Sequence, residues 1–228
     1  MLNLRSDRFQ SLLHLPRKVF SHPCLPLVRM GILPPVLFID DLMKVLNKPY
    51  YVSLFSASAL HGAAHQQPFE FYVTTVYPAN RRINSNGVVI NFYIKTRIPD
   101  AGIIEVKADM GMVKVSGPEL TAYDMVYFQN KAGGLNRAVT AIDELSEKMS
   151  PAILKKMTSR DFSSATLQRL GYILDRVLLK KKLGNSIFDV LTGRKIFPVP
   201  LNTIKSKAGF KADSKWKIII NEIVESEI

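Results

Sequence analysis

Cysteine is nearly absent from this chain of 228 residues, which has only Cys24. A single thiol excludes an internal disulfide and a cysteine-based zinc site. Long hydrophobic runs are also missing: no stretch of about 18 apolar residues occurs, so we expect no membrane span. Prolines and histidines interrupt the stretch after the first arginines, which makes a poor signal-peptide core. These absences together predict a cytoplasmic protein with no membrane contact.

Histidine is scarce, and all four residues lie before position 66. The chain has neither a G-x-S-x-G sequence nor a glycine-rich phosphate-binding motif, so Ser116 and Asp124 have no downstream histidine to complete a hydrolase site. His61 and His65 are four residues apart, but Gly62 and a polar loop interrupt the helix that would align them on a metal. We interpret both as core or capping residues. We therefore expect a non-enzymatic protein without catalytic residues, metal or cofactor.

Acidic residues are few in the C-terminal third, and this gives the composition its clearest functional signal. The net charge is +12, and residues 151–217 hold 15 lysines and arginines against 4 acidic residues. Residues 1–150 are closer to balance, with 16 basic and 12 acidic residues. Clustered positive charge is typical of proteins that bind nucleic acid or an acidic partner. A solvated, solubilising face explains the same numbers equally well.

The first 35 residues have no sustained helical or strand periodicity. Five prolines interrupt them, at positions 16, 23, 26, 34 and 35. We expect residues 1–35 to form an irregular N-terminal arm with at most one short helix near Arg8–Leu13. Residues 36–228 are then a single domain.

Periodicity within residues 36–228 predicts an α+β fold: a mixed β-sheet of four to six strands packed with helices, followed by a C-terminal helical group. Apolar and β-branched residues predict strands at Glu70–Thr75, Val88–Thr96, Ile103–Ala108 and Met112–Ser116. Apolar spacing and capping residues predict one helix that begins at Phe38. They predict six further helices, at Val52–His61, Pro118–Phe128, Gly134–Lys148, Pro151–Met157, Ser164–Leu178 and Ser186–Leu191. Residues 194–214 read as a basic loop, and Trp216–Val224 as a strand that can return to the sheet.

The basic residues of the C-terminal third are the candidate binding residues. Arg169 and Arg176 are seven residues apart, so they share one face of a predicted helix. The cations that follow in the sequence are expected to extend this face into a continuous basic surface. Four residues of the predicted sheet region can contribute to the same surface: Arg81, Arg82, Lys95 and Arg97. The cations that follow Arg176 are Lys180, Lys181, Lys182, Arg194, Lys195, Lys205, Lys207, Lys211, Lys215 and Lys217. Such residues would contact phosphates with little sequence preference. The plain alternative is a core helix with a charged outer face.

A second class of function is weakly indicated by Asp100, Glu105 and Lys107, which lie on or beside a predicted strand. An acid-x-lysine pattern of this kind occurs in metal-dependent nucleases, and a nucleic-acid-binding or nuclease-like protein is therefore the alternative function.

Several short segments, each weak alone, occur in a specific order: Gly31–Pro35, Phe38–Met43, Pro49–Ser53, Ala59–Gly62, Phe71–Thr75, Val113–Glu119, Gly133–Leu135, Gln168–Tyr172 and Trp216–Ile228. Their order resembles the C-terminal domain of AbiEi antitoxins, the antitoxin half of a bacterial type IV toxin–antitoxin pair. The resemblance implies a non-enzymatic antitoxin that neutralises a cognate nucleotidyltransferase-like toxin, in systems of phage defence by abortive infection.

Members of the family that this chain resembles also have an N-terminal winged helix-turn-helix, which binds their own promoter. Residues 1–35 lack its three-helix pattern, so they are expected to be a remnant of, or a replacement for, a DNA-binding domain. The resemblance thus implies antitoxin activity from residues 36–228. Because the winged-helix pattern is missing from residues 1–35, we expect DNA binding and transcriptional autoregulation to be weakened.

Overall fold

The structure is a computed structural model that describes residues 33–63, 68–85, 87–109, 111–131, 133–157 and 162–225. Backbone contacts divide the chain into two units, Met1–Leu33 and Pro34–Ile228, and everything below concerns the second. The predicted N-terminal arm lies almost wholly outside the described residues, as do Cys24, the short helix at Arg8–Leu13 and His65. Of the residues assigned to that arm, Pro35 begins a 3-10 turn, η2 (Pro35–Leu37), which leads into α3 (Ile39–Val45).

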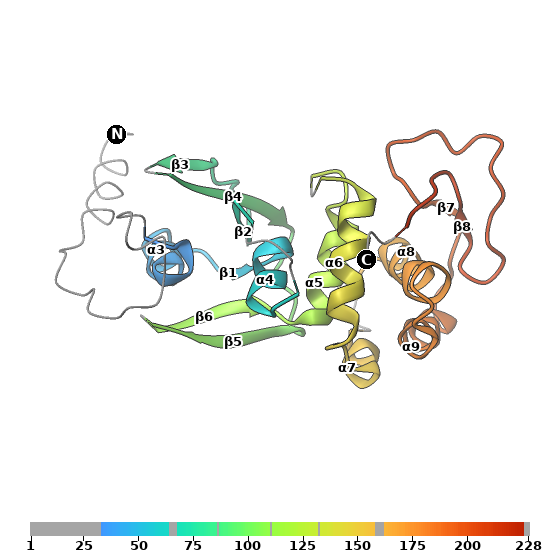
Figure 1. Ribbon diagram of the computed structural model, residues 1–228, viewed down its shortest axis with the longest axis horizontal. Helices are drawn as coiled ribbons and strands as arrows, with labels where there is room; N and C mark the ends of the chain where they lie inside the picture. The colour runs from blue at the N-terminus through green and yellow to red at the C-terminus, as the bar shows by residue number, and fades with distance from the viewer. Residues whose placement is uncertain are drawn as a thin grey trace. The chain divides into compact units, whose positions relative to one another are not determined.

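Six strands form one mixed sheet: β1 (Tyr50–Val52), β2 (Phe71–Val76), β3 (Ile83–Ser85), β4 (Val88–Lys95), β5 (Ile103–Ala108) and β6 (Gly111–Ser116). Their spatial order is β3-β4-β2-β1-β6-β5 (Figure 1). Strands β2 and β4 pair in parallel, as do β1 and β6, and the other neighbours are antiparallel. The predicted α+β class, with a mixed sheet of four to six strands, is confirmed.

Strands β1 and β3 are the two strands of this sheet that the sequence did not predict. Each has three residues, too few to show an alternating pattern. Strand β1 nevertheless lies in the middle of the sheet, with Tyr50, Tyr51 and Val52 all buried. The helix predicted at Val52–His61 therefore starts too early, because Val52 is a strand residue and α4 covers Leu54–Leu60.

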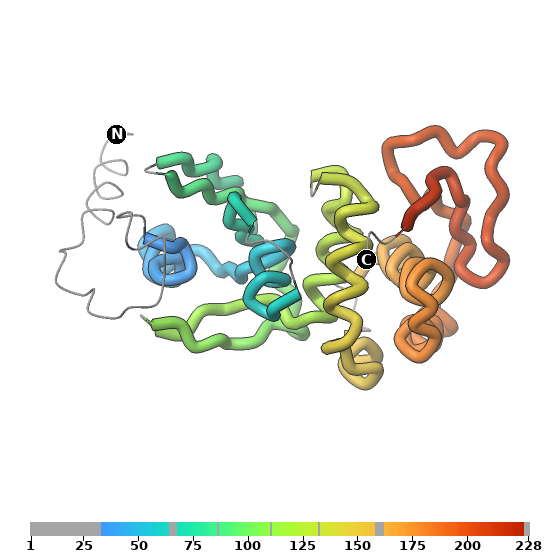
Figure 2. Tube along the Cα trace, in the orientation of Figure 1, coloured from blue at the N-terminus to red at the C-terminus, as the bar shows by residue number. Residues whose placement is uncertain are grey.

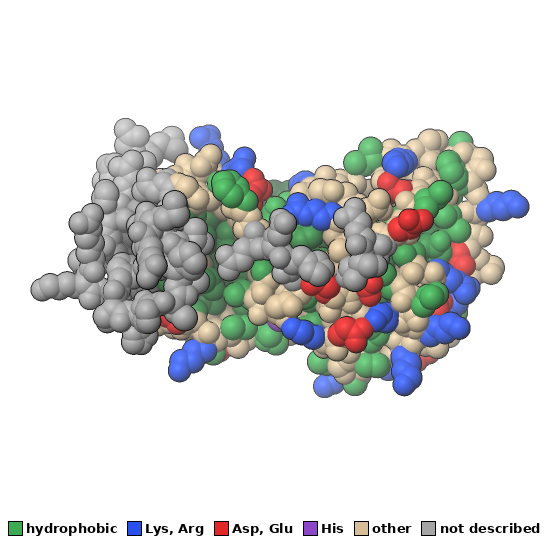
Figure 3. Space-filling model, viewed as in Figure 1, with side chains coloured by type: hydrophobic (Ala, Val, Ile, Leu, Met, Phe, Trp, Pro, Cys, Tyr) green, Lys and Arg blue, Asp and Glu red, His purple; other side chains and the backbone are tan. Residues whose placement is uncertain are grey.

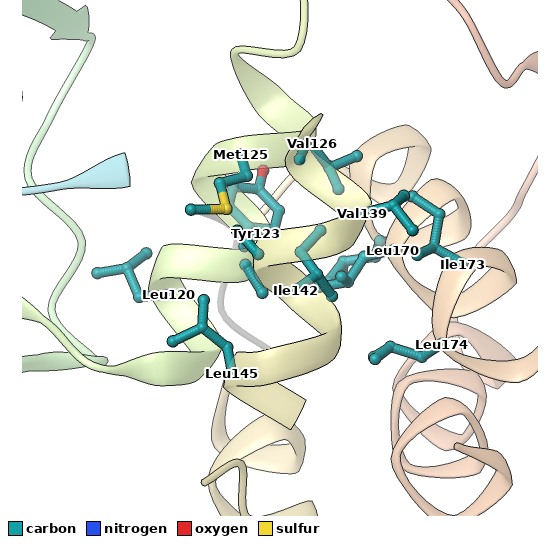
Figure 4. Packing of buried hydrophobic residues seen from close by; sticks show 14 of the residues in the cluster. Leu120, Tyr123, Met125, Val126, Val139, Ile142, Leu145, Leu170, Ile173 and Leu174 are labelled. Carbon is teal, nitrogen blue, oxygen red and sulfur yellow. The ribbon is translucent and has the colours of Figure 1, made fainter. Parts of the chain in front are cut away.

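The helices α4, α5 (Pro118–Tyr127) and α6 (Leu135–Ser146) join the sheet to the C-terminal part of the chain. Buried residues of α6 recur at helical spacing, as in Leu135, Val139 and Ile142, so that helix buries one face. Figure 4 shows Val139 and Ile142 of α6 between α5 and Leu170, Ile173 and Leu174. The core thus continues from the sheet, through α5 and α6, to Leu170, Ile173 and Leu174.

The predicted C-terminal helical group consists of α7 (Pro151–Lys156), α8 (Ser164–Tyr172), a π-helical turn η3 (Ile173–Val177) and α9 (Lys181–Thr192). Helix α9 begins five residues earlier than the predicted Ser186. Its first turn is lysine-rich and contains Gly184, a poor helix former. Glycine is needed there because an added Cβ would lie 2.8 Å from the Cβ of Asp175.

After α9 the chain loops outward and returns to α8 (Figure 2). The prediction that Trp216–Val224 forms a strand that can join the main sheet is wrong. Only β8 (Ile218–Ile219) forms, and it pairs in parallel with β7 (Val199–Pro200) in a separate two-stranded sheet. The basic loop predicted at 194–214 therefore contains a packed element, since β7 lies within it and Leu201 is buried. In the described part of the chain, no helix is long and apolar enough to cross a membrane.

Candidate functional site

Two residues of α8, Gln168 and Arg169, hold the C-terminal segment through its backbone. The Gln168 Nε2 atom donates to the carbonyl oxygens of Phe197, at 2.9 Å, and Trp216, at 2.8 Å. The Arg169 Nε atom donates to the carbonyl oxygen of Pro200 at 2.8 Å. Arg169 is only 9% exposed, and its burial lowers the pKa of the guanidinium. The structure therefore places Arg169, a predicted binding residue, inside the fold.

Trp216 fits against α8 at Gly171 and is fully buried. An added Cβ on Gly171 would lie 2.0 Å from the Trp216 ring, so no larger residue fits without movement. The indole Nε1 donates to Asp175 Oδ2 at 2.9 Å, and Lys215 Nζ lies 2.8 Å from the same oxygen. Burial alone would raise the pKa of Asp175, but the hydrogen bonds from Lys215 and Trp216 and the charge of Arg176 bring it below its usual value. These contacts hold Lys215 and Trp216, in the chain segment that returns after α9, against α8 and η3.

Three further predicted cations are engaged in ion pairs. Arg176 Nε lies 3.2 Å from Asp213 Oδ2, and Lys205 Nζ lies 2.7 Å from Glu222 Oε1. Lys180 pairs with Glu147, and this hydrogen bond raises the pKa of the lysine. Each pair joins segments far apart in sequence, so none could be assigned from local spacing.

The cations on the sheet side do not join the C-terminal ones. Arg81 and Arg82 precede β3, the outer strand at one edge of the sheet, and Arg82 pairs with Glu70. Figure 1 shows β3 on the opposite side of α5 and α6 from α9. Arg194 belongs to the C-terminal part, where its Nη1 atom donates to the Phe162 carbonyl oxygen at 2.8 Å.

The exposed cations among the predicted binding residues include four lysines of the C-terminal third: Lys181, Lys182, Lys195 and Lys207. Among the residues that the structure describes, no carboxylate pairs with any of their ammonium groups. Lys181 lies one helical turn before Asn185, whose side chain contacts Lys215 at 3.0 Å. Lys195 lies 5.3 Å from the ring of Phe197. We call these four residues the exposed lysines.

Lys95, which the sequence assigned to the basic surface, is instead largely buried, with 11% of its side chain exposed, and it forms an ion pair with the fully buried Asp124. The Tyr51 hydroxyl donates to Asp124 Oδ2 at 2.7 Å. Rings of three tyrosines lie 5.3 to 5.7 Å from the Lys95 ammonium: Tyr51, Tyr123 and Tyr127. Burial raises the pKa of Asp124, and the charge and hydrogen bond of Lys95 oppose this without cancelling it. No sequence signal links Lys95 on β4 to Asp124 on α5, since they are 29 residues apart.

The residues considered for catalysis or metal binding, His61, Glu105 and Lys107, do not come together in one site. His61 ends α4, and its Nε2 atom lies 2.7 Å from the Ser116 carbonyl oxygen, in agreement with a capping role. Glu105 and Lys107 are exposed on β5, an edge strand. Across the described residues, no group of three or more His, Cys, Asp and Glu side chains could hold a metal ion. The exposed lysines are side chains on the surface of this domain that could contact a negatively charged partner.

The architecture defines an α+β domain in which a mixed sheet continues into a helical group. Residues 51–176 match the model of the AbiEi antitoxin C-terminal domain, which is more than half of the chain. The chain belongs to this family, as the order of its short segments predicted. The match ends at Arg176, so the exposed lysines and the returning C-terminal segment lie beyond it.

Solved structures add a likeness in fold. The crystal structure of the RV2827C protein from Mycobacterium tuberculosis has a TM-score of 0.57 at 16% identity, over 82% of this chain and 68% of that chain. An antigenic nucleotidyltransferase-like protein from Paracoccidioides brasiliensis has a TM-score of 0.43 at 12% identity, over 67% of this chain and 89% of that one, and this low score carries no conclusion. No curated protein sequence matches the chain.

Proposed function

We propose that this protein is the antitoxin of a type IV toxin–antitoxin system and neutralises a nucleotidyltransferase-like toxin by binding rather than by catalysis. The single observation that carries the proposal is the match of residues 51–176 to the AbiEi antitoxin C-terminal domain. Cytoplasmic action and a role in phage defence belong to the same proposal. Each depends on the toxin being the functional partner.

The exposed lysines are the proposed contact residues. Surface cations without a neighbouring carboxylate keep their charge available to a partner, whereas paired cations are already partly neutralised. Among the cations predicted from the sequence, this favours Lys181, Lys182, Lys195 and Lys207. Lys181 and Lys182 are adjacent in the first turn of α9, so they present two charges from a rigid element.

Co-expression tests the proposal directly. The toxin gene encoded next to this protein is induced with and without the antitoxin, and growth is measured. We expect the wild-type chain to restore growth and the double variant Lys181→Glu/Lys182→Glu to restore it poorly, because the charge is reversed without touching the core. The matched control is Lys107→Glu/Lys131→Glu, which makes the same charge change at exposed lysines outside the C-terminal third.

Two results would contradict parts of the proposal separately. If wild-type protein, shown to be folded by circular dichroism, fails to restore growth, the antitoxin assignment is wrong. If both double variants restore growth equally, the antitoxin assignment stands and the contact residues are wrong. Isothermal titration of the purified toxin with the antitoxin then determines whether neutralisation involves direct contact.

A further inference from the structure

The loop between β7 and β8 has a fixed base. Asn202 Oδ1 accepts hydrogen bonds from the backbone nitrogens of Ile204, at 2.8 Å, and Lys205, at 3.1 Å. The Asn221 side chain is only 4% exposed, and its Nδ2 atom donates to the carbonyl oxygens of Asn202, Lys205 and Ser206. Buried amides that satisfy several backbone groups hold a loop in one conformation. The first half of this loop is therefore anchored.

The second half of the loop is anchored as well. The Ile220 backbone nitrogen donates to the Lys211 carbonyl oxygen at 3.0 Å, and Ala212 forms an antiparallel bridge with Ile219. Between the two anchors, residues 207–211 project as Lys-Ala-Gly-Phe-Lys, which we call the loop tip. Gly209, at its centre, has a φ of +82°, which favours glycine, and no atom lies within 4 Å of where its Cβ would be.

The loop tip presents an aromatic ring between two cations. Phe210 is 51% exposed, and no aromatic partner contacts it within the described part of the chain. No carboxylate among the described residues pairs with Lys207 or Lys211. Figure 3 shows hydrophobic and basic side chains intermixed at the end of the molecule where Figure 1 places β7 and β8. A single exposed apolar residue is ordinary, but a ring beside two uncompensated ammonium groups on an anchored loop is a specific arrangement.

The charge around the loop favours a negatively charged partner, and the exposed ring of Phe210 favours a nucleic acid over an acidic protein. Residues 194–217 contain seven lysines and arginines and one acidic residue, Asp213, which is paired with Arg176. Two of the seven, Lys205 and Lys215, are paired with Glu222 and Asp175, and Lys207 and Lys211 at the loop tip are exposed. An exposed ring adds what a phosphate-binding surface alone lacks, because it can stack on the face of a base. Bases of a duplex are stacked on one another and cannot receive the ring, whereas unpaired bases can.

We propose that the loop tip binds single-stranded nucleic acid, with Phe210 stacked on an unpaired base and Lys207 and Lys211 on the adjacent phosphates. This goes beyond the proposed antitoxin function and does not depend on it. The loop lies outside residues 51–176, so the family match does not imply it.

The test uses the full chain and a short oligothymidylate or oligouridylate as the probe. Phe210→Trp introduces a reporter at the tip, and the natural Trp216 contributes little change because it is fully buried. We expect the oligonucleotide to quench the introduced indole, and the affinity to fall as salt rises. Lys207→Ala and Lys211→Ala should each reduce the slope of log affinity against log salt by about 0.7, the value for one phosphate contact on a single strand.

Phe210→Leu tests stacking itself, since it keeps an apolar side chain and removes the ring. We expect it to weaken binding of the single strand at least about fivefold, the lower end of the effect of losing one stacked base. Phe69→Leu is the matched control, because Phe69 is 85% exposed and precedes β2. That variant should bind as the wild type does.

Three results would overturn the proposal: no quenching at low salt, equal binding by Phe210→Leu and wild type, or equal quenching by single strand and duplex. A loss of toxin neutralisation in Phe210→Leu, with oligonucleotide binding unchanged, would also overturn it and identify a protein as the partner of the tip. Failure of growth restoration in co-expression, by contrast, bears only on the antitoxin proposal.

Discussion

At the scale of single residues, Gly171 and Trp216 show how closely the C-terminal segment is fitted to α8. The ring occupies the space that any side chain at position 171 would need. Around it, Gln168 and Arg169 donate to carbonyl oxygens of the returning chain, and Asp175 accepts from the Trp216 indole. The sequence Gln168–Tyr172, which helped to indicate the family, thus has a packing role.

We expect Gly171→Ala to destabilise the protein by about 1–3 kcal/mol, because the new methyl group must displace a buried indole. Urea denaturation followed by Trp216 fluorescence measures this change. Gly193→Ala is the matched control: no atom lies within 4 Å of its added Cβ, and its φ is −85°. Equal stability of Gly171→Ala and wild type would show that α8 and the segment are less tightly packed than described.

At the scale of elements, Lys95 at the end of β4 and Asp124 on α5 form a buried ion pair that links sheet and helix. A buried charge is tolerated when its partner is present and is costly when the partner is removed. The rings of Tyr51, Tyr123 and Tyr127 lie 5.3 to 5.7 Å from the Lys95 ammonium, close enough for a cation–π attraction that also stabilises the charge.

We expect Lys95→Met and Asp124→Leu each to lower the free energy of unfolding, Lys95→Met by about 3 kcal/mol because it leaves a buried carboxylate alone. The double variant should lose less than the sum of the two, since neither charge is then left unpaired. Urea denaturation of the four proteins gives the coupling energy. Strict additivity of the two losses would mean that the ion pair is not formed.

Elements were predictable from sequence where the pattern is local and long enough. The stripe of Leu135, Val139 and Ile142 identifies α6, and the β-branched residues of Ile103–Ala108 predict both ends of β5 correctly. Strand β1 has only three residues, and its position comes from pairing with β2 and β6. The contact partners of the basic residues could not be predicted from sequence either, because they are distant along the chain: Arg169 contacts Pro200, 31 residues away, and Lys205 contacts Glu222.

At the scale of the whole described unit, the segment after α9 completes the core. Leu201, Trp216 and Ile218 are at most 1% exposed and belong to the same buried cluster as α5 and α8. The match to the family model does not include this segment, since it ends at Arg176. Its packing depends on pairs of residues too distant in sequence for any local pattern.

A chain that ends at Gly193 should therefore be much less stable and should bind the hydrophobic dye ANS, because burying each large apolar side chain stabilises by about 1.5–3 kcal/mol. The matched control replaces only residues 207–211 with a Gly–Ser linker of equal length, which leaves both anchors of the loop intact. That variant should unfold at nearly the wild-type urea concentration. Equal stability of the truncated chain would show that the segment is an appendage.

The return of the chain to α8 has a consequence for the order of events on the ribosome. Helix α8 is synthesised well before Trp216, so its Gly171 face stays uncovered until the later residues emerge. A nascent chain can form the sheet and α5 early, yet it cannot close its core until this late segment arrives. The core around α8 is thus completed only after Trp216 and Ile218 have been synthesised.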